Sequence, residues 1–199
     1  DFMDLDTLAE MFPGVRFVFI VRDPRDVMAS MKYVRPQDGN PAQYHPVAYA
    51  LYWRMAYRTE QRFAQDDRAP IHQVVFEALV RNADGEAQRL AEFLGTRLSD
   101  EVPVWGTNTS FPGGDRKRIT DTERWICERI AGTVMAEMGY APSGARPRLR
   151  DLPDLLRTTV RFVLYQVRRL ARKADARVSV RDYLRNLFVP VRGIDTRNS

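Results

Sequence analysis

The chain has 199 residues, of which 44% are hydrophobic and 29% are charged, and its net charge is +5. This composition is ordinary for a globular domain, and a chain of this length buries about 70% of its unfolded surface without disulfides. The single cysteine, Cys127, excludes an internal disulfide and a cysteine-based zinc site, and it fits a reducing compartment. The sequence contains no run of about 18 apolar residues, the length that would predict a transmembrane helix. The acidic start also lacks the pattern of a signal peptide, so we expect a cytoplasmic protein.

The first forty residues predict a helix, a strand and a second helix. Segment 4–12 carries apolar residues on one helical face and is followed by Pro13-Gly14, which breaks a helix. The run RFVFIV at 16–21 is apolar, β-branched and aromatic, as is typical of a strand covered on both faces of a parallel sheet. Asp23 followed by Pro24 predicts an N-cap and a first helical turn. Apolar residues then recur at helical spacing, at positions 27, 31 and 34.

The elements that follow alternate in type. After a loop at 35–46 the patterns predict a long helix at 47–64 and a strand at 72–80 that runs into a turn. An amphipathic helix at 85–95, ended by Gly95, and a helix within 119–140, whose N-cap is Thr120 or Asp121, are predicted next. A loop rich in Gly, Thr, Asn and Ser covers 106–120. This order predicts an α/β fold with a mostly parallel sheet. Two strands are too few for a stable sheet, so we expect either further strands or a chain that is the C-terminal part of a longer protein.

The last quarter of the chain differs in charge. Residues 146–199 carry a balance of +9, against −4 for residues 1–145. Within this quarter, segment 152–174 predicts an amphipathic helix, with apolar residues at 152, 156, 160, 163, 167 and 170 and arginines at 157, 161, 168, 169 and 172 mostly on the other side. We therefore divide the chain into a domain at 1–141 and a basic helical extension at 142–199. The apolar side either packs on the domain or lies on an anionic membrane surface, and we expect weak, salt-sensitive membrane binding.

A candidate anion site follows the first strand. Ligands bind outside the carboxyl ends of strands in an open parallel sheet, and Arg22 is the first residue past such an end. The helix after it is expected to offer free N–H groups and a positive dipole end. Ser30 lies about 10 Å further along that helix, so a guanidinium and a hydroxyl can hold one phosphate from two sides. In the alternative, Arg22 pairs with Asp23 or Asp26 and Ser30 faces a neighbouring helix.

The segment VFIVRDPRDVMAS resembles the 3′-phosphate-binding motif of sulfotransferases that use 3′-phosphoadenosine 5′-phosphosulfate (PAPS). In that family an arginine closes a buried strand, a serine follows eight residues later, and both bind the 3′-phosphate of the donor; here these positions are Arg22 and Ser30. Other segments resemble the family in the same order between residues 5 and 141: LAEMFPGVRF, VVFEALVRN, RLAEFLG, NTSF, TERW and MGY. The last three resemble its bacterial glycan-type and tyrosylprotein-type branches.

The resemblance implies a P-loop-NTPase-like parallel sheet flanked by helices. It also implies transfer of a sulfuryl group, without a metal, from PAPS to a hydroxyl or amine of an unidentified glycan, peptide or small molecule, and no nucleic acid partner. Phe76 and Ser110 are expected to cover the nucleoside, with Phe76 stacked on adenine. Arg116, Lys117 and Arg118 lie in a loop that folds over the nucleotide in this family; in the alternative, they are a solvated run of charges.

The chain departs from the family in two ways. The glycine-rich loop with a lysine or arginine that holds the 5′-phosphosulfate has no counterpart, and the catalytic base usually lies upstream of Arg22, so the catalytic residue is unknown. Phe76 and Ala78 also stand where a tyrosine and an acidic residue are common. We favour a C-terminal part of a longer protein that is inactive alone. The alternatives are a P-loop kinase-like enzyme and a degenerate, non-catalytic domain that docks through its basic tail.

Three further residues carry structural expectations. We expect Trp125 to anchor its helix in the core and Glu77 to act as a capping or ion-pair residue. His45, in the loop before the long helix, is expected to be a surface residue, with a place in an acceptor cleft as the alternative.

Overall fold

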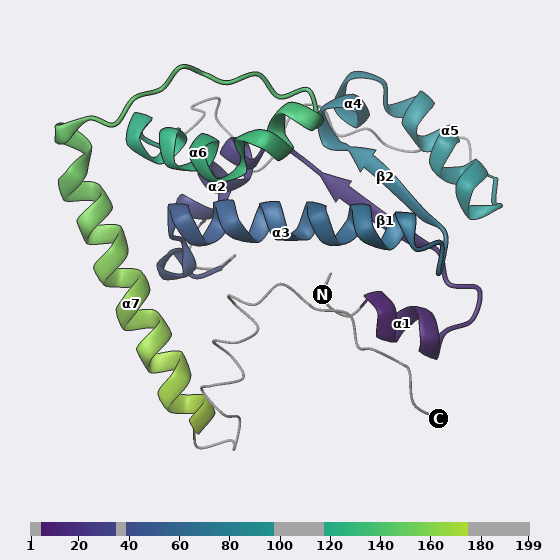
Figure 1. Cartoon of the computed structure of the whole chain (residues 1–199), viewed down its shortest axis with the longest axis horizontal. Helices are drawn as coiled ribbons and strands as arrows, with labels where there is room; N and C mark the ends of the chain where they lie inside the picture. The colour runs from purple at the N-terminus through teal and green to yellow at the C-terminus, as the bar shows by residue number, and fades with distance from the viewer. Residues whose placement is uncertain (1–4, 35–38, 98–117, 175–199) are drawn as a thin grey trace.

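The computed structural model describes residues 5–34, 39–97 and 118–174. In chain order the elements are α1 (Leu5–Met11), β1 (Phe17–Val21), α2 (Pro24–Lys32), the short 3-10 helix η2 (Pro41–Gln43), α3 (Pro46–Gln65), β2 (Ile71–Val75), α4 (Phe76–Arg81), α5 (Ala83–Leu94), α6 (Asp121–Glu137), the 3-10 helix η3 (Leu149–Asp151) and α7 (Leu152–Ala174). Figure 1 shows these elements along the chain. The predicted mixed α/β class is confirmed in this coarse form.

The sheet of the described residues consists of β1 and β2, which run parallel. Their register pairs Phe17 with Ile71 at one end and Val21 with Val75 at the other. Because the two strands are parallel, their carboxyl ends meet at one edge, and α2 and α4 both begin there. Residues that follow the two strands are therefore neighbours in space although they lie about fifty positions apart in the sequence.

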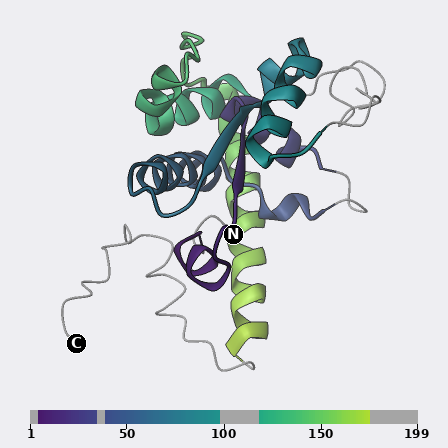
Figure 2. The ribbon, with the colours of Figure 1, turned by 90° about the vertical axis from the view of Figure 1, so that its right-hand side faces the viewer.

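One face of the sheet packs on α3, which in turn packs on α6 (Figure 1). The rings of Phe17 and Phe63 meet edge to face with centroids 5.3 Å apart. Val21 of β1, Tyr57 of α3 and Val134 of α6 form one buried cluster. Helices α3 and α6 thus cover the same face of the sheet, and Figure 2 shows α3 and α5 on opposite sides of the strands.

The other face is covered unevenly. On β2, the ring of His72 stacks on Phe93 of α5 at 5.1 Å. On β1, Val18 is 40% exposed and Ile20 is 62% exposed. The expectation that the first strand is covered on both faces is therefore wrong for the described residues. The reason is connectivity: α5 follows β2 and lies over that strand, and no described helix lies over the same face of β1.

A second core joins α2, α6 and the start of α3. Met28 and Ala29 of α2 are buried against Cys127 and Ala131 of α6. The predicted apolar positions 27, 31 and 34 are only partly buried, so the buried side of α2 is shifted by about one residue from the predicted side. Small residues on α6 let the two helices approach closely, and this fixes the direction of the helix that follows Arg22.

Several local predictions are confirmed and two are wrong. Asp23 caps α2, Gly95 adopts the left-handed conformation at the end of α5 (φ 69°), and Thr120 forms a capping box with Glu123 at the start of α6. The predicted strand-to-turn segment 72–80 instead changes to helix α4 at Phe76, because a short apolar run fits either structure. Trp125 is 36% exposed and does not anchor α6 in the core. The division of the chain at residue 141 stays a prediction.

We expect Glu60→Gln to stabilise the protein near pH 7.5 but not near pH 4. Glu60 is buried on α3, where only Gln73 donates to it among the described residues, at 3.4 Å, and desolvation raises the pKa of its carboxyl above the ordinary 4.5. A raised native pKa means that this group stabilises the fold fully below about pH 4.5 and loses that contribution as the pH rises and it ionises. Urea unfolding at both pH values measures the difference.

The matched control is Glu92→Gln, which replaces an exposed carboxylate on α5. We expect it to change the free energy of unfolding little at either pH. Equal stability of wild type and Glu60→Gln near pH 7.5 would contradict the burial argument.

Candidate functional site

Arg22 lies where β1 passes into α2, and the structure holds its backbone and side chain in place. The Trp53 indole N–H on α3 donates to the Arg22 carbonyl at 3.0 Å. The guanidinium lies over the ring of Phe76, 4.6 Å from its centroid. Phe76 is the first residue of α4, so this cation–π contact joins the carboxyl ends of the two strands. The structure thus brings together two residues that the sequence predicts for the site.

The guanidinium is only weakly neutralised. Its ion pair with Asp26 is long, with Nη2 and Oδ2 3.5 Å apart, and Asp26 is half exposed. The Arg22 Nε is buried without a hydrogen-bond partner among the described residues. The predicted alternative of an Arg22–Asp26 pair is present, whereas the Asp23 carboxylate pairs with Arg25 instead. A strong acceptor placed beside Arg22 would therefore find unused donors.

Ser30 is half-buried on α2, two turns beyond Arg22. Asp26 and Ser30 are one helical turn apart, so both lie on the same side of α2. The hydroxyl and the guanidinium thus border the same side, with the Asp26 carboxylate between them. An anion bound by both the Arg22 guanidinium and the Ser30 hydroxyl has to displace the Asp26 carboxylate. Asp26 is half exposed, so water can solvate its carboxylate after the displacement.

The N-terminus of α2 does not offer the free N–H groups that the sequence analysis expects. Asp23 binds all of them: its side chain accepts from the Arg25 N–H at 2.8 Å, and its carbonyl accepts from the Asp26 and Val27 N–H groups at 3.0 and 3.1 Å. Pro24 has no N–H. The expectation is wrong because a good N-cap uses the same donors that an anion needs. An anion at this position would therefore have to be bound by side chains.

Arg25 fixes this turn to α6. Its guanidinium pairs with Asp23 at 2.6 Å and with Glu128 at 2.9 Å, and it donates to the Ala141 carbonyl at 2.9 Å. All three polar side chains are mostly buried. Arg25 is therefore a structural residue that holds the turn between β1 and α2, and it is not a free cation for a ligand.

Glu77 is a second structural residue at this turn. The sequence predicts a capping or ion-pair role for it but not its partners. Its carboxylate accepts from the Asp23 backbone N–H at 2.9 Å and from the Tyr140 hydroxyl at 2.9 Å. Burial, together with the hydrogen bond to Glu77, raises the pKa of Tyr140, so this phenol stays a donor. Glu77 is thus a capping residue, as expected, and it ties the carboxyl ends of both strands to the segment after α6.

Three predicted site residues, Ser110, Arg116 and Lys117, lie outside the described residues. The described residues add no further reactive group to the site. Burial raises the pKa of Cys127 to about 12, so it stays an un-ionised thiol at neutral pH. Within the described ranges, no group of three or more His, Cys, Asp and Glu side chains is arranged to hold a metal ion. No helix in those ranges is long and apolar enough to cross a membrane.

Sequence reasoning missed the contacts that position Arg22. Trp53 lies 31 residues from Arg22, and the motif VVFEALVRN places Phe76 near a nucleotide without indicating its contact with Arg22. The segment MGY, which was noted for its resemblance, supplies Tyr140. No local signal marks these partners, because the fold alone brings them together.

Comparison with protein families gives one match: a model described as the Sulfotransferase family covers residues 1–100, just over half of the chain. The matched segment contains Arg22, Ser30 and Phe76 and both strands. Searches of curated proteins and of solved structures gave no match.

We expect Glu77→Ala to destabilise the fold by about 2 kcal/mol, because it leaves the Asp23 N–H and the Tyr140 hydroxyl without their acceptor. Tyr140→Phe should cost about 1 kcal/mol in the wild type and close to nothing when Glu77 is already alanine. Urea unfolding of the two single variants and the double variant measures this coupling.

Glu137→Ala is the control, since its ion pair with Arg58 is exposed on both sides and contributes little. Additive effects of Glu77→Ala and Tyr140→Phe would show that the hydrogen bond between them does not contribute to stability.

Proposed function

The chain belongs to the sulfotransferase family, and we propose that it binds 3′-phosphoadenosine 5′-phosphosulfate through Arg22 and Ser30. The family transfers sulfuryl groups. In this proposal the donor is PAPS, acting as a co-substrate, and the acceptor is a hydroxyl or amine of a glycan, peptide or small molecule. The bacterial glycan-type and tyrosylprotein-type branches are the ones that the segments NTSF, TERW and MGY favour.

The observation that carries the proposal is the state of Arg22. Its side chain stands at the carboxyl end of β1 and is 17% exposed; its buried Nε has no hydrogen-bond partner in the described part of the chain, and its ion pair with Asp26 is 3.5 Å long. An ion pair of that length with a half-exposed carboxylate contributes about 1 kcal/mol at most. A 3′-phosphate carries more charge than Asp26 and three acceptor oxygens, so it can replace that carboxylate and gain shorter, charge-assisted hydrogen bonds.

Ser30 and Phe76 complete the proposed nucleotide site. The Ser30 hydroxyl donates to the phosphate from the far side of Asp26. One face of the Phe76 ring is covered by Arg22, so adenine stacks on the opposite face. The proposed contacts of Ser110, Arg116 and Lys117 with the nucleotide rest on the family resemblance.

The reaction is in-line transfer. A base removes the acceptor proton, the acceptor oxygen or nitrogen forms a bond to sulfur, and the bond between sulfur and the bridging oxygen of the donor breaks. Cationic groups stabilise the charge that develops on that bridging oxygen. The chain offers no candidate for the glycine-rich loop that does this, so we propose that the loop and the base belong to a part of the protein that precedes these residues. The uncovered face of β1 at Val18 and Ile20 supports that proposal. The proposal implies a P-loop-like sheet of more than two strands in the longer protein.

We expect the chain to bind adenosine 3′,5′-bisphosphate at least about tenfold more tightly than adenosine 5′-monophosphate, because only the former offers a phosphate to Arg22. Arg22→Ala should cost about 1.5–3 kcal/mol in the bisphosphate complex, as for hydrogen bonds to a charged group, and should leave the monophosphate complex nearly unchanged. Calorimetric titration of both nucleotides measures the ratio.

Two variants sharpen this titration. Asp26→Asn removes the carboxylate that competes with the phosphate, so it should strengthen bisphosphate binding several-fold and affect the monophosphate little. Arg58→Ala removes an exposed arginine on α3 and should change neither affinity. Equal affinity of the wild type for both nucleotides would remove the 3′-phosphate assignment.

We expect the 199-residue chain to bind the bisphosphate and yet to transfer no sulfate from labelled PAPS, because it lacks a 5′-phosphosulfate loop. A mixture of hydroxyl and amine acceptors is assayed with and without the protein. Transfer above the uncatalysed rate would show that these residues contain the loop and the base, and would overturn the proposal that both lie elsewhere. Binding of the bisphosphate by the same sample would show that the protein is folded, so that the absence of transfer is not due to misfolding.

A further inference from the structure

Helix α7 leaves a row of aliphatic side chains uncovered. The exposed fractions of Leu152, Leu156, Val160, Val163, Leu164 and Val167 lie between 49% and 66%. We call these six residues the α7 stripe. Five of them recur at spacings of three and four residues, so they form one continuous side of the helix. The interpretation that the apolar side packs on the domain is not supported, since these residues remain exposed.

Side chains of α7 outside the stripe attach the helix to the domain, mostly through polar groups. The Lys32 ammonium donates to Asp154 at 2.6 Å, the imidazole of His45 contacts the Thr159 hydroxyl at 3.2 Å, and Gln43 donates to the Tyr165 hydroxyl at 2.8 Å. The His45 ring also packs on Phe162 at 5.1 Å, and its burial lowers the pKa of His45. His45 is thus a docking residue for α7 and not the surface residue that was expected. Because these contacts hold the helix, the stripe is not needed to attach it.

Arginines border the α7 stripe on its other edge. Arg157, Arg161 and Arg168 are exposed and recur on one side of the helix, next to the stripe in the helical projection. Asp154 is the only acidic residue between positions 152 and 174, and Lys32 binds it. The exposed surface of α7 therefore combines an aliphatic row with an adjacent row of positive charge.

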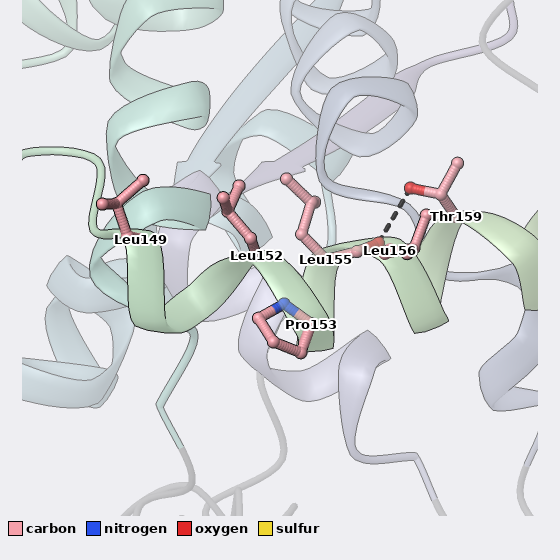
Figure 3. Close-up of a pocket in the computed structure, with 6 residues that line it drawn as sticks. All are labelled: Leu149, Leu152, Pro153, Leu155, Leu156 and Thr159. Carbon is pink, nitrogen blue, oxygen red and sulfur yellow. Dashed lines mark hydrogen bonds between the residues drawn. The ribbon is translucent and has the colours of Figure 1, made fainter.

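The apolar surface is wider at the start of the helix. A hollow of about 720 Å³ is lined by five apolar residues and Thr159, namely Leu149, Leu152, Pro153, Leu155 and Leu156 (Figure 3). The Thr159 hydroxyl donates to the Leu155 carbonyl at 2.8 Å, so it presents no unbonded hydrogen to this hollow. In Figure 1, α7 lies at the edge of the molecule, away from the sheet and α5.

We propose that α7 is a docking surface for an anionic lipid bilayer. Its 23 residues extend roughly 35 Å, and a helix of this kind lies in the plane of the interface with its apolar side among the acyl chains and its arginines at the headgroups. The stripe contains only Leu and Val, whereas the centres of protein–protein interfaces are enriched in Trp, Tyr and Arg. A second copy of α7 would place its own row of arginines near the first, and the two rows would repel each other. Anionic lipid headgroups would instead neutralise the arginines.

The test is flotation of the full 199-residue chain with two kinds of vesicle, phosphatidylcholine alone and phosphatidylcholine with about one phosphatidylglycerol in three lipids. We expect the chain to float with the anionic vesicles at low salt, less at high salt, and not with the neutral vesicles. Replacing Arg157, Arg161 and Arg168 together by Gln should weaken partitioning roughly 100-fold, since each arginine near the surface contributes about fivefold.

Two further variants separate charge from apolar contact. Arg97, Arg129 and Arg146, all exposed and all outside α7, are replaced by Gln in the matched control, which removes the same charge and should keep binding. Leu156→Gln with Val160→Gln and Val163→Gln changes exposed residues of the stripe and should abolish flotation while circular dichroism shows an unchanged fold. These outcomes do not depend on nucleotide binding, so they stand apart from the proposed transferase function.

Three results would overturn the proposal. The first is absence of flotation with anionic vesicles at low salt. The second is equal loss of binding in the α7 triple variant and in the control triple variant, which would indicate attraction to net charge alone. The third is a dimer in sedimentation experiments without lipid that the stripe variant abolishes, since the stripe would then be covered by a second copy of the chain.

Discussion

A buried carboxylate on α6 determines how the helices of this protein are arranged. Glu123 is 1% exposed and accepts hydrogen bonds from the Thr120 N–H at 2.8 Å, the Tyr44 hydroxyl at 3.0 Å and the Lys32 ammonium at 2.8 Å. A charge removed from water is tolerated only when such partners are all in place. Burial acts to lower the pKa of Lys32, but the bonds of its ammonium to Asp154 and Glu123 outweigh that effect, so the pKa of Lys32 is raised and the ammonium stays charged. The end of α2, the segment after η2 and the starts of α6 and α7 are thereby fixed to one another.

The candidate site depends on this arrangement because α2 extends from Arg22 to Lys32. At its first end, Asp23 uses the free N–H groups of the helix, and Arg25 and Glu77 hold the turn to α6 and α4. These contacts exclude the common way of binding an anion at a helix N-terminus. What remains is a side-chain site, in which a weakly paired guanidinium stacks on an aromatic ring. In the proposed function, such a site would be more selective than a bare helix end, since binding would depend on the spacing between Arg22 and Ser30.

The parts of the fold that depend on neighbouring residues could be predicted from the sequence. The strand at 16–21, the Asp23 cap, the helix ended by Gly95 and the N-cap of the helix that begins near Thr120 all follow from local patterns. What failed depends on distant residues: Ile20 is apolar whether or not a helix covers it, and a helical pattern does not say which side of α2 meets α6. The contact of Arg22 with Phe76 bridges 54 positions, and only the parallel register of the two strands creates it.

The same reasoning explains why the apolar side of α7 is free. A helix with one apolar side ordinarily packs that side on the domain. Here Lys32, at the end of α2, forms an ion pair with Asp154, and His45 contacts Thr159 and Phe162. These contacts rotate the aliphatic residues away from the domain. One short helix, α2, therefore carries the proposed nucleotide site at its first residues and the anchor of α7 at its last, so a membrane bound by α7 would lie at a fixed distance and orientation from the nucleotide.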